Sequence, residues 1–178
     1  MWTDATLPFP RGTTYKDDGN LVLADNTTCG AGVVGRLCET TDSSGRPLVL
    51  RVVRADAALT NIGRKCVSYT AAKIGFNADA LCVSAGVVAS IVDDAYPTTF
   101  DVAAYDLFYV VEEGYVLALA ETDVAAGAVV AAYTNSKVKL ATAGQYIIGT
   151  ATENDGTTTA SCATIHVSGG LKLSDVSG

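Results

Sequence analysis

The sequence predicts an all-β protein: a compact β-barrel or jelly-roll-like sandwich preceded by an extended N-terminal arm. Short runs rich in Val, Ile, Thr and Tyr recur at intervals of roughly 8–12 residues, with turn residues between them, which is typical of β-sandwiches and barrels. Apolar residues make up 49% of the 178 residues, but only 7% are aromatic, and Ala, Val and Gly dominate. Such small side chains suit closely packed β layers, whereas a helical domain of this size would carry more Leu, Glu, Lys and Arg.

Residues 1–47 are predicted to form the arm. Pro8 and Pro10 flank Phe9, and many Gly residues lie among Thr, Asp and Asn, a composition that interrupts regular structure. Only Leu21–Leu23 and Val33–Val34 are predicted as brief strands. The large apolar side chains of this segment either fold back on the body or dock on a neighbour, and a disordered tail is the alternative to both. We expect a partner-binding arm, with Trp2, Leu7 and Phe9 as anchors and Arg11 and Lys16 as charge contacts.

Residues 48–168 are predicted to form the body, because β-branched runs bounded by turn residues begin there. Two apolar runs flank Glu112-Glu113-Gly114 and predict a hairpin. A helix over Val124–Ala132 is conceivable, but Gly127 favours a loop followed by a strand. Residues 169–178 are a Gly- and Ser-rich tail. The predicted strands cover residues 48–54, 66–70, 81–85, 87–92, 106–112, 115–120, 128–133, 137–140, 146–151 and 159–167.

The charge is acidic and unevenly distributed. The net charge is −7; residues 48–76 carry a net +4, and residues 77–135 hold nine carboxylates with no Lys or Arg. An acidic chain argues against nucleic acid as a partner. The two blocks favour head-to-tail contacts between copies or docking on a charged shell; two solvated faces are the alternative.

Neither metal, cofactor nor membrane motifs occur in the sequence. The five cysteines are widely spaced and form no CxxC pair, so we expect reduced, mostly buried thiols and no metal site. Gly30–Gly35 matches a nucleotide loop by glycine spacing alone, without the required strand and helix, so no cofactor is expected. No secretory signal is visible, and no apolar run reaches the ~20 residues of a membrane span.

Enzyme chemistry also lacks a convergent set of residues, so we expect no catalytic residues and a non-enzymatic role. The single histidine, His166, lies in an alternating strand, where a polar-face or core position is the expected one, although pairing with a cysteine is formally possible. Neighbours such as Asp93 and Asp94 point to opposite faces of a strand, so we interpret them as turn or rim charges. A sugar-binding module remains an alternative, because five tyrosines are available for an exposed aromatic face: Tyr69, Tyr105, Tyr109, Tyr115 and Tyr133.

The order of motifs over residues 101–167 resembles one protein family. Tyr105–Gly114 has a polar residue, an apolar strand, acidic residues and a glycine; Thr122–Val130 has an acidic, Ala-Gly, then Val turn; Lys137–Ala151 ends in a Gly-containing Ile-rich strand. Together with the run Pro47–Arg54 after an irregular first segment, this resembles the small decoration (cement) proteins of tailed-bacteriophage heads.

That resemblance implies a β-barrel or jelly-roll-like body on the outer surface of a mature virion head. The implied partners are the major capsid protein, whose neighbouring subunits the protein would clamp against internal DNA pressure, and further copies of itself, commonly in a homotrimer. Synthesis in the host cytoplasm is implied as well. The alternatives are another phage structural β domain, such as a tail or fibre component, or the carbohydrate-binding surface module.

Overall fold

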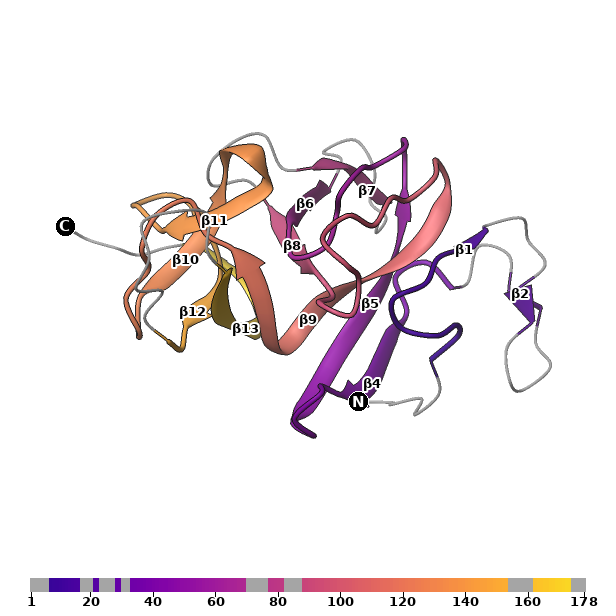
Figure 1. The fold of residues 1–178 in the computed structure, drawn as a ribbon, viewed down its shortest axis with the longest axis horizontal. Coiled ribbons are helices and arrows are strands. Elements are labelled where there is room, and N and C mark those ends of the chain that lie inside the picture. The colour runs from indigo at the N-terminus through magenta and orange to yellow at the C-terminus, as the bar shows by residue number, and fades with distance from the viewer. Residues whose placement is uncertain are drawn as a thin grey trace.

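The computed structural model describes residues 7–16, 21–22, 28–29, 33–69, 77–81, 88–153 and 162–173, and their fold is all-β (Figure 1). These residues contain no α-helix, and one 3₁₀ turn, η1 (Thr134–Ser136), joins two strands. The predicted fold class is therefore confirmed. The strands are β1 (Tyr15–Lys16), β2 (Leu21–Val22), β3 (Thr28–Cys29), β4 (Leu37–Thr41), β5 (Pro47–Ala55), β6 (Cys66–Tyr69), β7 (Asn77–Leu81), β8 (Ala89–Val92), β9 (Asp106–Leu119), β10 (Val129–Tyr133), β11 (Lys137–Leu140), β12 (Tyr146–Ala151) and β13 (Cys162–Leu173).

One 11-stranded sheet contains every strand except β2 and β3, which pair with each other. Its order is β11-β10-β12-β13-β9-β8-β6-β7-β5-β4; β1 also pairs with β9, and β9 pairs additionally with β5. All pairings are antiparallel except β5–β7. The β9–β5 pairing connects strands within the path, while β10–β13 and β4 extend beyond it, so the sheet as a whole is not closed into a barrel and is sandwich-like. The sandwich alternative is therefore the one confirmed.

The long strand β9 is shared by the two halves of the sheet. Its first half pairs with β5 and β8, and its second half, from Gly114 onward, pairs with β13. In Figure 1, β9 crosses from the side of β4–β8 to the side of β10–β13. Gly114 has φ +120°, and a Cβ there would lie 2.9 Å from the carbonyl oxygen of Pro47. The hairpin predicted at Glu112-Glu113-Gly114 is wrong, because separate partners keep both halves extended and the glycine only bends the strand.

Strands β5 and β9 are covered on both faces. Val52 and Val53 are neighbours and point to opposite faces of β5, yet both are fully buried. Phe108 and Tyr109 show the same on β9. Runs of consecutive apolar residues in these strands are therefore explained by two-sided burial, and the main hydrophobic core lies around them.

Most predicted strands of the body occur within one or two residues of their predicted bounds, including β5, β10, β11 and β12. Val33–Val34 is not a strand: it begins a turn in which the N–H of Arg36 donates to the carbonyl of Val33 (3.0 Å). The predicted strand 81–85 overlaps only the end of β7, since residues 82–87 lie outside the described residues. Within the predicted arm, residues 7–16 contact the body, and β4 pairs with β5 along its full length.

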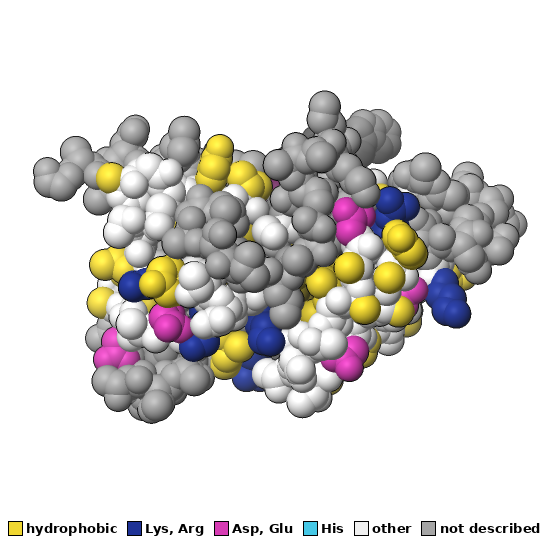
Figure 2. Space-filling model, turned by 90° about the horizontal axis from the view of Figure 1, so that it is seen from above, with side chains coloured by type: hydrophobic (Ala, Val, Ile, Leu, Met, Phe, Trp, Pro, Cys, Tyr) yellow, Lys and Arg dark blue, Asp and Glu magenta, His cyan; other side chains and the backbone are white. Residues whose placement is uncertain are grey.

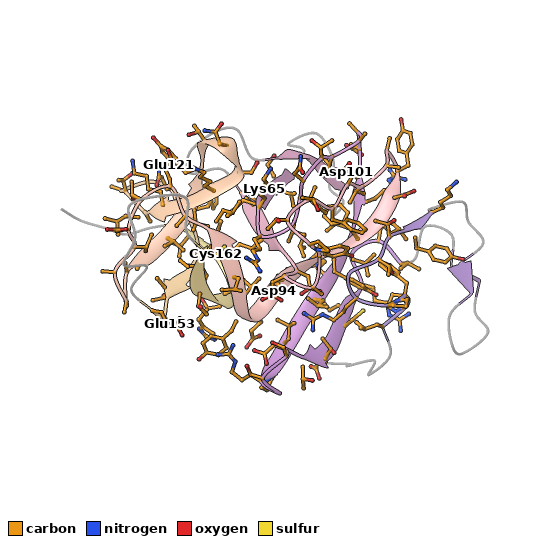
Figure 3. The ribbon with its side chains drawn as sticks, viewed as in Figure 1. Lys65, Asp94, Asp101, Glu121, Glu153 and Cys162 are labelled. Atoms are coloured by element: carbon orange, nitrogen blue, oxygen red, sulfur yellow. The ribbon has the colours of Figure 1, made fainter. Side chains whose placement is uncertain are left out.

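Two loops fasten the second half of β9 to the first half of the sheet. The N–H of Leu119 donates to the carbonyl of Arg64 (2.8 Å), and the N–H of Leu117 donates to the Asp94 carboxylate (3.3 Å). Arg64 also donates to the sulfur of Cys162 on β13 (3.3 Å). Figure 3 shows Asp94 and Cys162 near the middle of the molecule. Burial raises the pKa of Asp94, although the Leu117 N–H opposes this shift.

Candidate functional site

The segment of residues 7–16 is held on the body by an aromatic contact. Phe9 is only 4% exposed, and its ring stacks on Tyr109 with 4.3 Å between centroids. The hydroxyl of Tyr109 donates to the Phe9 carbonyl (2.8 Å) and accepts from the Phe9 N–H (3.2 Å). Burial raises the pKa of Tyr109, so the hydroxyl stays protonated and able to donate. Phe9 is thus a core residue of its own chain.

A buried ion pair fixes the same segment. Asp93 is fully buried, and Arg11 binds its carboxylate with two nitrogens, Nε at 2.8 Å and Nη2 at 2.5 Å. Arg11 also donates to the carbonyl of Thr41 at the end of β4 (3.0 Å). The hydrogen bond to Asp93 raises the pKa of the guanidinium. A bidentate, charge-assisted pair at this depth orients the segment rather than merely attracting it.

The other predicted partner-binding residues have different surroundings. Leu7 is partly buried against the core, and Lys16 is exposed on β1, where it pairs in register with Asp106. Trp2 lies outside the described residues. That these five residues bind a partner stays a prediction; the described contacts of Phe9 and Arg11 lie inside the chain.

His166 is half-buried and lies against an aromatic ring. Its ring packs on Tyr115, its cross-strand neighbour on β9, with 4.7 Å between centroids. Arg46, from the β4–β5 turn, lies 4.1 Å from the centre of the same Tyr115 ring, and Asp42 accepts a 2.6 Å hydrogen bond from Arg46. Burial acts to raise the pKa of Asp42, but the hydrogen bonds and charge of Arg46, together with the hydrogen bond from the Ser44 N–H, outweigh burial, so the pKa is lowered. This stack joins the two halves of the sheet beside the bend in β9.

The cysteines whose side chains are described form no disulfide. Cys38 and Cys66 are buried, as predicted, while Cys162 is half-buried and contacts Arg64. Nowhere in the described ranges do three or more His, Cys, Asp or Glu side chains gather in a way that suits a metal ion. The described part of the chain also contains no helix with the length and hydropathy of a membrane span.

The tyrosines considered for sugar binding do not form a shared exposed face. Tyr109 is fully buried, and Tyr115 and Tyr133 are half-buried beneath cationic side chains. The side chain of Tyr69 lies outside the described residues. Tyr105 differs, because 61% of it is exposed.

The charged side chains do not segregate on the face shown in Figure 2, where those of Lys and Arg lie among those of Asp and Glu. Two local features stand out instead: Tyr105, which was predicted only as one of five tyrosines for a sugar-binding face, and Leu140, which was not predicted. Among the side chains that the structure describes, Tyr105 and Leu140 are the large hydrophobic ones that are exposed, at 61% and 54%. Tyr105 precedes β9, and Leu140 ends β11. For Leu140 the sequence carries no signal of exposure, since the alternation of β11 places it on the same face as the buried Val138 and so predicts burial.

Comparison with known proteins shows a loose likeness to a solved structure. No family model matches the chain, and no curated protein matches it. Among solved structures, it is similar to the N-terminal base of the head fibre protein gp8.5 of bacteriophage phi29, with a TM-score of 0.42 and 15% identity. The match covers 71% of this chain and 99% of that chain. Since the TM-score is below 0.5, no function is carried over from it.

Proposed function

We propose that this chain is a structural decoration (cement) protein that binds the outer surface of a tailed-phage head and clamps neighbouring major capsid subunits. The role is non-enzymatic and uses no cofactor, nucleic acid or membrane. The protein is made in the host cytoplasm and acts on the virion, in copies that associate as a homotrimer. Each copy adds binding energy to a shell under internal DNA pressure, and many modest contacts add up through multivalency.

The observation that carries the proposal is the rigid attachment of the two sheet halves. A clamp transmits force only if its body does not deform, and here β9 runs through both halves while Arg64 and Asp94 fasten its second half to the first. The ionic groups also serve this rigidity: Arg51 pairs with Glu112 across β5 and β9 at 2.8 Å. Such a body offers preorganised surfaces to a protein partner.

The alternative of a carbohydrate-binding module is less well supported. A sugar platform on a sheet needs aromatic side chains that share an exposed face. Tyr109 is in the core, and cations cover Tyr115 and Tyr133. A tail or fibre component has the same rigidity requirement as a head protein, so sedimentation must separate these two.

The contacts of residues 7–16 reduce the number of arm residues that can bind the shell. Phe9 and Arg11 serve the body, so removing residues 1–16 would leave Asp93 buried without its partner. We therefore assign shell contact to Trp2, Leu7 and Lys16. Removing residues 1–6, or replacing Trp2 with Ala, spares the buried contacts and isolates the shell contact.

The test is co-sedimentation of the purified chain with expanded heads and, separately, with tails of the phage that encodes it. We expect binding to heads, weakened by Trp2→Ala and unaffected by Ser43→Ala, an exposed turn substitution. Binding to tails alone would establish the tail alternative, and capture by a glycan array without head binding would establish the sugar-binding one. If the variant lacking residues 1–6 occupies heads as fully as the full chain does, the arm assignment is wrong.

A further inference from the structure

Two exposed patches with opposite charge lie on different halves of the molecule. The first, called the tip, consists of residues 56–61 and 97–106 and carries Tyr105. The second, called the hairpin patch, consists of residues 129–145 and carries Leu140. Figure 3 shows Asp101 of the tip and Glu121, which bonds to β11 through its backbone, on opposite halves of the long axis.

The tip is rigid although it is built from loops. Leu59 and Val102 exchange two backbone hydrogen bonds (2.9 and 2.8 Å), and the N–H of Asn61 donates to the Asp101 carboxylate (2.8 Å). The N–H of Tyr105 donates to the carbonyl of Ala55 (2.7 Å). Because these bonds fix the tip in advance, little conformational entropy is lost when it docks.

Tyr105 has an unfavourable backbone conformation, which the turn before β9 and the hydrogen bond from its N–H to the Ala55 carbonyl hold in place. Its φ is +70°, in the left-handed region that an aromatic residue rarely adopts. Its ring is 61% exposed, so burial inside the chain does not offset the strain. Strain that persists at an exposed aromatic side chain points to a role outside the chain. Tyr is also among the residues most enriched at the centres of protein interfaces.

The hairpin patch offers a complementary surface. Leu140 lies on the face of β11 that buries Val138, yet it is 54% exposed. The charged residues of the patch are Lys137 and Lys139, without any Asp or Glu. Lys137 bonds to Glu121 from outside the patch (2.6 Å), and Lys139 lies over Tyr133.

The charge of the tip has the opposite sign. Its charged residues are Asp56, Asp101 and Asp106, with no Lys or Arg in either loop. Lys16 is the cation that sheet pairing brings opposite Asp106. The tip therefore has an apolar centre with acidic neighbours, and the hairpin patch has an apolar centre with basic neighbours. Opposite charges of this kind steer two protein surfaces together.

We propose that the tip of one copy docks on the hairpin patch of a second copy, with Tyr105 packing against Leu140 and Asp101 facing Lys139. Because two different patches meet, the contact is heterologous, and repeating it closes a ring or extends a filament. The homotrimer of the proposed function is one such ring. Only the identification of the ring with a homotrimer rests on the proposed function, because the contact itself forms between copies without a shell.

The test is sedimentation of the purified full chain over a rising concentration series, without heads. We expect the chain to self-associate, and we expect Tyr105→Gly and Leu140→Ser each to weaken association by about tenfold or more. Tyr105→Gly also relieves the positive φ, so this variant should melt higher than the parent chain. Lost association together with raised stability excludes misfolding as the cause. Tyr105→Phe keeps the ring and should associate like the parent.

A mixing experiment tests the heterologous geometry. Tyr105→Asp and Leu140→Asp should each sediment as monomers, yet an equimolar mixture should form a one-to-one dimer, since each variant keeps one intact patch. A parent chain that stays monomeric throughout the series, or a mixture that recovers no dimer, overturns the inference. Head co-sedimentation of the Tyr105→Gly monomer is read separately, so decoration can stand when the contact between copies fails, and the reverse.

Discussion

Replacing Arg11 with Ala tests how firmly the N-terminal segment is fixed to the body. Asp93 is fully buried, and the Arg11 side chain is 19% exposed, so the substitution leaves a carboxylate inside the protein. Its remaining described partner is the N–H of Ala95, at 3.4 Å. Removing one member of a buried ion pair costs about 3–5 kcal/mol. For a chain of this length, where each kcal/mol shifts Tm by about 2–4 °C, Tm should fall by about 6–20 °C.

The assay is thermal unfolding followed by circular dichroism and checked by urea titration, both at neutral pH. Arg46→Ala is the matched control, because Arg46 makes a similar 2.6 Å bond to Asp42 but is 45% exposed. Asp42 keeps its hydrogen bonds from the backbone N–H groups of Ser44 and Arg46 in this variant. Loss of a half-exposed ion pair costs about 1 kcal/mol or less, and loss of the contact with Tyr115 costs about 0.5–1 kcal/mol, so this control should lose less than Arg11→Ala does. Arg11→Lys should fall between the two, since lysine cannot bind both carboxylate oxygens as a planar fork.

A double variant shows whether Arg11→Ala loses stability because it leaves a charge buried or because it removes contacts. Arg11→Ala combined with Asp93→Asn removes the charge along with its partner, so it should be more stable than Arg11→Ala alone. The reasoning is refuted if Arg11→Ala costs no more than Arg46→Ala. It is also refuted if neutralising Asp93 recovers none of the loss.

Three further substitutions follow from the same contacts, all measured by thermal and urea unfolding. Tyr109→Phe removes the hydroxyl that satisfies the N–H and C=O of Phe9 and should cost about 1–3 kcal/mol. Gly114→Ala places a Cβ 2.9 Å from the Pro47 carbonyl at φ +120° and should cost more than about 1 kcal/mol. Asp94→Asn should stabilise the protein at neutral pH. Burial raises the pKa of this carboxyl, so its ionised form opposes folding. The gain in stability from Asp94→Asn should therefore vanish as the pH falls below the pKa that Asp94 has in the unfolded chain.

Each of these has its own control and its own contrary result. Tyr105→Phe is the control for Tyr109→Phe, because its ring is exposed, and an equal loss from both would contradict the buried hydrogen bonds. Gly127→Ala has a positive φ but open space around its Cβ, so Gly114→Ala must cost more if close packing at the bend matters. For Asp94→Asn, a gain that grows as the solution is acidified would reverse the assigned sign.

The body could be predicted from sequence because its signals are local. Residues 48–54 are β-branched and bounded by Gly45-Arg46-Pro47, and β5 forms there. The polar Thr134-Asn135-Ser136 predicts a turn, and η1 forms there with left-handed Asn135 and Ser136. Such elements need no knowledge of distant partners.

The remaining features depend on distant partners. Gly114 after two glutamates is equally consistent with a turn and with a bend in a continuous strand. The pairing of β9 with β5 and with β13 determines that it is a bend. Arg11 and Asp93 lie 82 positions apart, and no periodic pattern links them. A large apolar residue such as Phe9 either docks on a neighbour or folds back, and the choice here depends on Tyr109, 100 residues away.

The course of β9 has a mechanical consequence. A pull that separates the two halves of the molecule is carried along the covalent backbone of one strand, not across the weak hydrogen bonds between neighbouring strands. To yield, the protein must slide β9 out of its ladder with β5 or with β13, which breaks many bonds in shear at once. A strand that runs lengthwise through both halves in this way is the arrangement that best resists a pull along the molecule.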